Sequence, residues 1–176
     1  MTTPGPVVAS RRLVIEPFDA ACVSKEYLSW LNDAEVMRFS NQRFRCHPAA
    51  SVSDNIASFK GTSNSFFAIR LADSGRMIGT MTAYVDEHHG TADMGLLIGD
   101  RTCWGQGYGL EAWSALMSRL FASQVRKVTG GALRPNVGML LIMERSGMHL
   151  EAVRSRQEIV DSVAQDVLYF ARFVDR

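Results

Sequence analysis

Three glycines occupy alternate positions in Trp104-Gly105-Gln106-Gly107-Tyr108-Gly109, directly before a segment with strong helical periodicity that begins at Leu110. The first backbone N–H groups of a helix have no partner within the helix, and the helix dipole adds positive charge there. Glycine lets a phosphate approach these groups because no Cβ stands in the way. The N–H groups of Gln106 to Leu110 are therefore predicted to form a phosphate or pyrophosphate cradle. A tight strand-to-helix turn that merely requires glycine is the alternative interpretation.

Two common nucleotide-binding motifs do not fit these glycines. A P-loop needs GxxxxGK followed by serine or threonine, and no lysine follows the glycines here. A dinucleotide fold needs GxGxxG after the first strand of a βαβ unit. Leu110 stands where its third glycine would be, and several strand patterns precede the loop.

The elements around the glycines follow strand and helix patterns in turn. The early part of the chain predicts a strand at 12–18, a helix after an N-cap at Ser24, a helix at 52–59, and an antiparallel meander of three strands at 66–71, 77–85 and 92–99. After the glycine-led helix, the patterns predict a strand at 126–133, a helix at 137–145 that ends near Gly147, and strands at 149–158 and 166–173 around the turn Asp161-Ser162. We expect a mixed α/β (α+β) domain with a central mixed sheet of six to seven strands, antiparallel at the start, and about four helices.

Length and composition limit the class of protein. The 176 residues, 47% of them hydrophobic and 21% charged, indicate one globular domain at 11–176 behind a flexible tail at 1–10. The net charge of +1 argues against nucleic acid as a partner, and no apolar run is long enough for a membrane helix. The start lacks a secretion signal, so a cytoplasmic protein is expected. Three cysteines without CxxC spacing predict neither a disulfide framework nor a metal site.

The segment from Gly99 to Ala112, with tryptophan before GxGYG and Glu-Ala after it, resembles the acyl-CoA pyrophosphate loop of the GNAT superfamily of N-acetyltransferases. It is similar to the branch that holds the ribosomal-protein alanine N-acetyltransferases, which also includes enzymes acting on nucleotide-linked amino sugars. Three further segments agree with this resemblance: Arg12-Leu13-Val14-Ile15 before Pro17, Asn136 with Glu144-Arg145-Ser146-Gly147-Met148, and Leu150-Glu151-Ala152. The resemblance covers most of residues 11 to 173.

The resemblance implies a set of contacts with acetyl-CoA, the expected co-substrate, and no metal. Trp104 to Gly109 would hold the CoA pyrophosphate, and Asn136 would hydrogen-bond the cofactor arm. The backbone of Leu96, Leu97 and Ile98 would pair with the pantetheine arm, and an N–H group near Ile98 would face the thioester oxygen. Because the arm needs unpaired backbone groups, the central strand should splay from the strand at 126–133.

The resemblance also bears on catalysis. Asp93 would lie beside the acetyl group, where it could act as general base directly or through water. A solvated carboxylate at a strand end is an equal alternative. Met143 stands where many relatives have a tyrosine that protonates the departing thiolate, so the general acid is not identified.

The expected activity is transfer of an acetyl group to a primary amine by direct attack in a ternary complex. The acceptor would be a small molecule or a peptide, with nucleotide-linked amino sugars among the candidates, and the enzyme could be a homodimer. Arg38, Arg43, Arg45 and His47 lie in a segment that resembles the acceptor-binding wall of the family, although a solvated basic loop is the alternative. The competing functions are a non-catalytic acyl-CoA-binding module and a nucleotide-binding protein of another fold.

Overall fold

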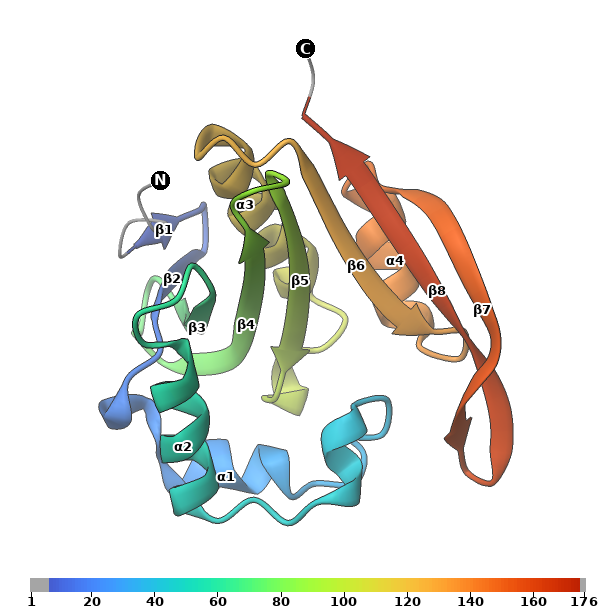
Figure 1. Ribbon diagram of the computed structural model, residues 1–176. Coiled ribbons are helices and arrows are strands. Elements are labelled where there is room, and N and C mark those ends of the chain that lie inside the picture. Colours follow the sequence, from blue (N-terminus) through green and yellow to red (C-terminus); the bar gives the residue numbers. More distant parts are fainter. Residues whose placement is uncertain (1–6, 175–176) are drawn as a thin grey trace.

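One open sheet of eight strands, in the order β1-β2-β3-β4-β5-β6-β8-β7, organises the computed structural model, which describes residues 7 to 174 (Figure 1). The strands are β1 (Val8–Ala9), β2 (Leu13–Pro17), β3 (Ser65–Leu71), β4 (Met77–Asp86), β5 (Thr91–Ile98), β6 (Lys127–Leu133), β7 (His149–Val160) and β8 (Val163–Phe173). The α-helices are α1 (Lys25–Leu31), α2 (Ala49–Phe59), α3 (Tyr108–Ala122) and α4 (Val137–Arg145). The mixed α/β class and the four helices are confirmed.

The sheet has one strand more than expected because Val8 and Ala9, assigned to a flexible tail, form β1 and pair with β2. That assignment is wrong for these two residues, and residues 1 to 6 lie outside the described part of the chain. The Ser10 hydroxyl, between β1 and β2, donates to Glu111 Oε1 of α3 at 2.7 Å. This hydrogen bond attaches the β1–β2 hairpin to the helix.

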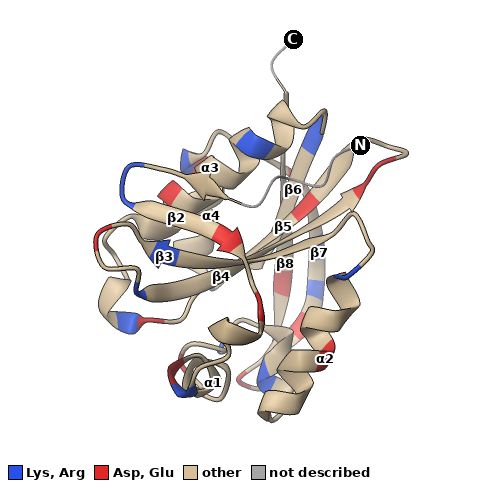
Figure 2. Cartoon of the chain, turned by 90° about the vertical axis from the view of Figure 1, so that its left-hand side faces the viewer, with Lys and Arg blue, Asp and Glu red and all other residues tan. Residues whose placement is uncertain are grey.

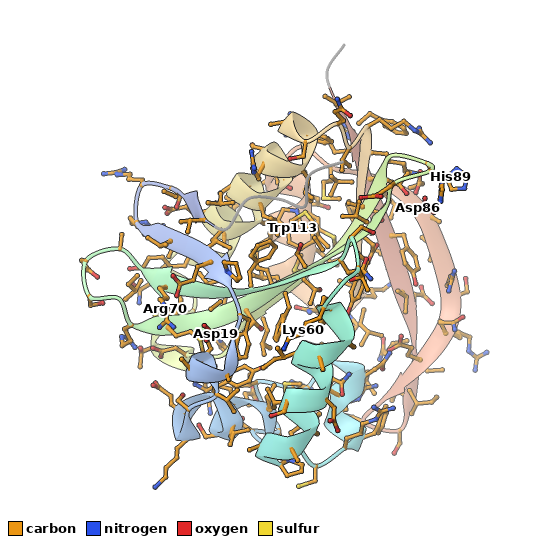
Figure 3. All side chains as sticks on the ribbon, turned by 60° about the vertical axis from the view of Figure 1, so that its left-hand side comes forward. Asp19, Lys60, Arg70, Asp86, His89 and Trp113 are labelled. Atoms are coloured by element: carbon orange, nitrogen blue, oxygen red, sulfur yellow. The ribbon has the colours of Figure 1, made fainter. Side chains whose placement is uncertain are left out.

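The two faces of the sheet carry different helices. The main core lies under α3 and α4 and contains the fully buried Trp113, which Figure 3 shows between α3 and the sheet. A second core, which contains Tyr27 and Trp30 of α1 and Val52 of α2, covers the other face. The predicted N-cap of α1 is confirmed, since Ser24 Oγ accepts from the Tyr27 N–H at 3.0 Å. Charged side chains of both signs are interspersed along the chain (Figure 2).

The sheet divides between β5 and β6. These parallel strands pair only from Thr91 to Asp93 on β5, against Lys127 to Thr129 on β6. Beyond these pairs the strands diverge toward their C-terminal ends (Figure 1), whereas β5 stays paired with β4 as far as Ile98. The expected splay is confirmed.

Candidate active site

The divergence exposes alternate backbone groups of β5. The Gly99 N–H donates to the Ile78 carbonyl at 3.0 Å, which fixes the register of β4 and β5. Because hydrogen-bonded pairs alternate in an antiparallel ladder, Leu97 bonds to β4, while the N–H and C=O groups of Leu96 and Ile98 point toward the opening. Of the three residues expected to pair with the cofactor arm, Leu96 and Ile98 are therefore the two whose backbone groups face the opening, whereas those of Leu97 face β4. The Ile98 carbonyl accepts from Trp104 Nε1 at 2.7 Å, so its N–H is the group that stays open.

The glycine loop follows β5 and leads directly into α3. Gly107 is the N-cap of α3 and has a left-handed backbone with φ of 80°, which glycine adopts without strain. Within the described chain, the N–H groups of Gly105 to Leu110 have no hydrogen-bond acceptor, and the first bond of the helix runs from Glu111 N–H to the Gly107 carbonyl. Gly109 has a packing role as well, because a Cβ there would lie 2.8 Å from Ile142 of α4. The loop therefore presents the row of donors that a pyrophosphate requires.

Arg12, which sequence reasoning placed only in a strand, lies against this loop. Its Nε donates to Glu111 Oε2 at 2.6 Å and its guanidinium also donates to the Gln106 carbonyl at 3.1 Å. The guanidinium carbon is 4.3 Å from the centre of the Tyr108 ring. Burial acts to raise the pKa of Glu111, but the hydrogen bonds from Ser10 and Arg12 outweigh it and leave the pKa below its usual value. The two partners are 99 residues apart, so local spacing contains no signal of their contact.

Asn136 lies at the N-terminus of α4, directly after β6. Its Oδ1 accepts from the Met139 N–H at 3.3 Å, so this side chain caps the helix. Its Nδ2 has no partner among the residues described. Because β5 and β6 are parallel, the N-termini of α3 and α4 lie at the same edge of the sheet, on either side of the opening.

Asp93 belongs to the last β5–β6 pair before the strands diverge. Its Oδ2 accepts from the Thr129 hydroxyl at 2.6 Å. Desolvation by the surrounding protein raises the pKa of Asp93, and the Thr129 hydrogen bond counteracts this only in part, although the side chain still reaches solvent. Tyr84, which pairs with Asp93, lies 5.8 Å from Phe59 of α2 between ring centres. The carboxylate therefore lies on the face that carries α2, opposite α3.

A cavity of about 720 Å³ opens between the α1–α2 connection and the tip of the β7–β8 hairpin. Arg38, Arg43 and Arg45 line it, whereas His47 does not and contacts the Gln42 carbonyl. Arg38 pairs with Asp161 at 3.0 Å. Arg43 donates to the Ile159 carbonyl at 2.7 Å, and Arg45 has no ion pair with the described residues. Two guanidinium groups of the cavity thus lack a carboxylate partner.

Two other kinds of site, a membrane span and a metal site, have no candidate among residues 7 to 174. No helix in this range is long and apolar enough to cross a membrane. No group of three or more His, Cys, Asp or Glu side chains in it could hold a metal ion.

The diverging parallel strands and the donor loop at a helix N-terminus suit a cofactor that joins a pyrophosphate to an extended arm, as an acyl-CoA does. The profile of the Acetyltransferase (GNAT) domain matches residues 12–149. The chain belongs to the GNAT family and is an N-acetyltransferase with acetyl-CoA as co-substrate. No curated protein sequence matches it.

Solved structures share the fold at low sequence identity. A spermidine N-acetyltransferase from Vibrio cholerae, in complex with CoA and spermine, has a TM-score of 0.84 at 12% identity, covering 93% of this chain and 96% of its own. The ribosomal L7/L12 alpha-N-protein acetyltransferase in complex with coenzyme A has a TM-score of 0.83 at 17% identity, covering 96% and 98%. The acetyltransferase from Salmonella typhimurium that modifies the N-terminal serine of L7/L12 has a TM-score of 0.80 at 17% identity, covering 96% and 99%.

Proposed function

We propose that the protein acetylates a primary amine by direct attack on acetyl-CoA within a ternary complex. One observation carries the proposal: the donor loop, Leu96 and Ile98 all present unpaired backbone groups along a single path between β5 and β6. The loop N–H groups bind the pyrophosphate, and the Asn136 amide donates to the cofactor arm. The N–H groups of Leu96 and Ile98 hydrogen-bond the arm and stabilise the oxyanion of the thioester.

Asp93 serves as the general base in this proposal. An alkyl ammonium has a pKa of about 10, so little of the free amine is present at neutral pH. A carboxylate with a raised pKa is a better proton acceptor at that pH than an ordinary aspartate. Asp93 lies at the end of the path away from the pyrophosphate, about 10 Å along β5 from Leu96 at about 3.3 Å per residue, so it takes the amine proton through water.

The cavity between α1 and the β7–β8 tip is the proposed entrance for the acceptor. Three arginines and two aspartates line the cavity, and both aspartates already have an arginine partner. The guanidinium groups of Arg43 and Arg45, which have no carboxylate partner among the described residues, disfavour a polycation such as spermine and bind phosphate or carboxylate well. We therefore favour an amine that carries an anionic group, a class that includes nucleotide-linked amino sugars. A peptide N-terminus, the acceptor of the L7/L12 acetyltransferases, is the second candidate.

Release of CoASH tests the activity directly. The amines are glucosamine 6-phosphate, glucosamine, a serine-initiated peptide and spermine, with NAD and ATP tested as competitors for CoA. Release with any amine supports transferase activity, whereas CoA binding without any release supports a binding module. Displacement of CoA by NAD or ATP would support a nucleotide-binding protein instead.

The matched pair of sugars tests the acceptor class. Arg45→Ala should raise KM for glucosamine 6-phosphate about tenfold, a modest value for a charge-assisted hydrogen bond, and leave KM for glucosamine unchanged. Lys60→Ala is the control, because Lys60 is a cation at the end of α2 that does not line the cavity (Figure 3). Equal KM values for the two sugars with the wild-type enzyme would contradict the anionic acceptor.

A further inference from the structure

Tyr169 of β8 lies over a glycine of the neighbouring strand. It pairs with Gly131 of β6. A Cβ placed on Gly131 would lie 3.0 Å from Tyr169 Cε1, 3.2 Å from Cδ1 and 3.5 Å from Cζ. The ring therefore lies over the β6 backbone at Gly131.

The Tyr169 side chain lies on the same face of the sheet as the proposed base. Thr129, which donates to Asp93, and Gly131 are two residues apart on β6, so they share a face of the sheet. Gly131 is also two residues past the last β5–β6 pair, where the strands have begun to diverge. On β5 the corresponding residue is Gly95, two residues past Asp93. Because both residues are glycines, no side chain fills the opening at this level. The Tyr169 ring lies beside the opening, over Gly131.

The environment of the ring suits a proton donor. The Tyr169 hydroxyl has no hydrogen-bond partner within the described chain. The Arg154 guanidinium lies 4.9 Å from the ring centre and packs against the ring.

On the other face of β6, a methionine lies against the strand. Met143 is fully buried there, and a Cβ on the adjacent Gly130 would lie 3.3 Å from its sulfur. A thioether has no proton to donate. By its resemblance to the family, Met143 stands where many relatives have a tyrosine, so that position offers no phenol to the opening.

We infer that Tyr169 protonates the departing CoA thiolate, an inference that rests on the proposed acetyl transfer. The amine nitrogen forms a bond to the thioester carbon as the C–S bond breaks. Asp93 takes one proton from the nitrogen, and the sulfur takes one from the Tyr169 hydroxyl. Return of a proton from Asp93 to the phenolate through solvent completes the cycle, so the products are the acetamide and CoASH.

The test varies both the residue and the leaving group. Tyr169→Phe is compared with wild type on acetyl-CoA and on the corresponding selenoester, acetyl-seleno-CoA, with the fastest of the four amines named above. A selenol is a stronger acid than a thiol, so its anion departs with less need of a proton donor. Tyr84→Phe is the control, because it removes a hydroxyl from the same face without facing the opening.

We expect Tyr169→Phe to lower kcat with acetyl-CoA by about 10²-fold, within the range of general acid catalysis. Its CoA affinity should be unchanged, and the loss should shrink at least tenfold with the selenoester. A merely structural role predicts the same loss with both esters, so that result would overturn the inference, as would a wild-type rate on acetyl-CoA. If the wild-type enzyme acetylates none of the amines, the proposed function itself fails.

Discussion

Replacement of Asp93 by asparagine should change activity and stability in opposite directions. The substitution keeps an oxygen that can accept the Thr129 hydrogen bond at 2.6 Å but removes the negative charge. Loss of a general base predicts a fall in kcat/KM of about 10²-fold or more, which corresponds to about 2.7 kcal/mol at 1.36 kcal/mol per factor of ten. CoA affinity should stay nearly constant, because Asp93 does not face the donor loop.

Stability should rise at neutral pH. The pKa of Asp93 is higher in the folded protein than in the unfolded chain, mainly because of desolvation. Between these two pKa values the folded state binds more protons, so wild-type stability falls as the pH rises through that window. The asparagine variant lacks this loss, and its Tm should exceed that of wild type at pH 7. The difference should vanish below about pH 4, where the aspartate is protonated in both states.

Asp86→Asn is the matched control at the β4–β5 turn, visible with His89 in Figure 3. The His89 N–H bond to the Asp86 carboxylate, at 3.0 Å, lowers the pKa of Asp86. Its replacement should therefore leave kcat/KM unchanged and should not raise Tm. The assays are thermal denaturation from pH 4 to pH 8 and CoASH release at pH 7. A near-normal rate for Asp93→Asn would refute the base assignment, and the base would then be sought among His88, His89, Glu151 and bulk water.

Three further variants test the cofactor path. Gly107→Glu should abolish CoA binding in calorimetry, because it adds a negative charge at the donor loop. Gly75→Glu, at a glycine with similar φ and open surroundings, should bind CoA normally, and equal binding by both would disprove the loop assignment. Arg12→Ala should weaken CoA binding about tenfold because the loop becomes less ordered, and it should lower Tm because Glu111 loses a partner. Unchanged CoA affinity would show that Arg12 serves stability alone. Asn136→Ala should cost about 1 kcal/mol of stability because α4 loses its N-cap. It should also weaken CoA binding in a titration, and unchanged affinity would contradict the contact between the Asn136 amide and the cofactor arm.

Sequence patterns located the elements whose signals are local. The helix at 137–145 has the predicted bounds because a capping asparagine precedes it and Gly147, with φ of 82°, ends it. The helix expected at 52–59 begins earlier, at Ala49 directly after Pro48. No strand or helix was predicted between α1 and α2, where contacts with the β7–β8 tip, such as that of Arg43 with the Ile159 carbonyl, hold the chain in place.

The candidate site also has a part with a local sequence signal and a part without one. The donor loop is contiguous, so its glycines could be interpreted from spacing alone. Thr129 and Tyr169 contribute through strand register, which sets Thr129 against Asp93 on β5 and Tyr169 against Gly131 on β6. Register depends on the whole sheet, and no short motif encodes it.

The two glycines of β6 show how one strand can serve both faces of the site. Gly130 faces α3 and α4, where Trp113 and Met143 would meet any added Cβ, so its lack of a side chain serves core packing. Gly131 faces the other way and provides the space that the Tyr169 ring occupies. Because successive residues of a strand alternate between faces, the missing side chains let the core approach the sheet on one side and the Tyr169 ring lie over it on the other. The two adjacent glycines of this central strand therefore serve two different purposes, core packing at Gly130 and the placement of an aromatic side chain beside the opening at Gly131.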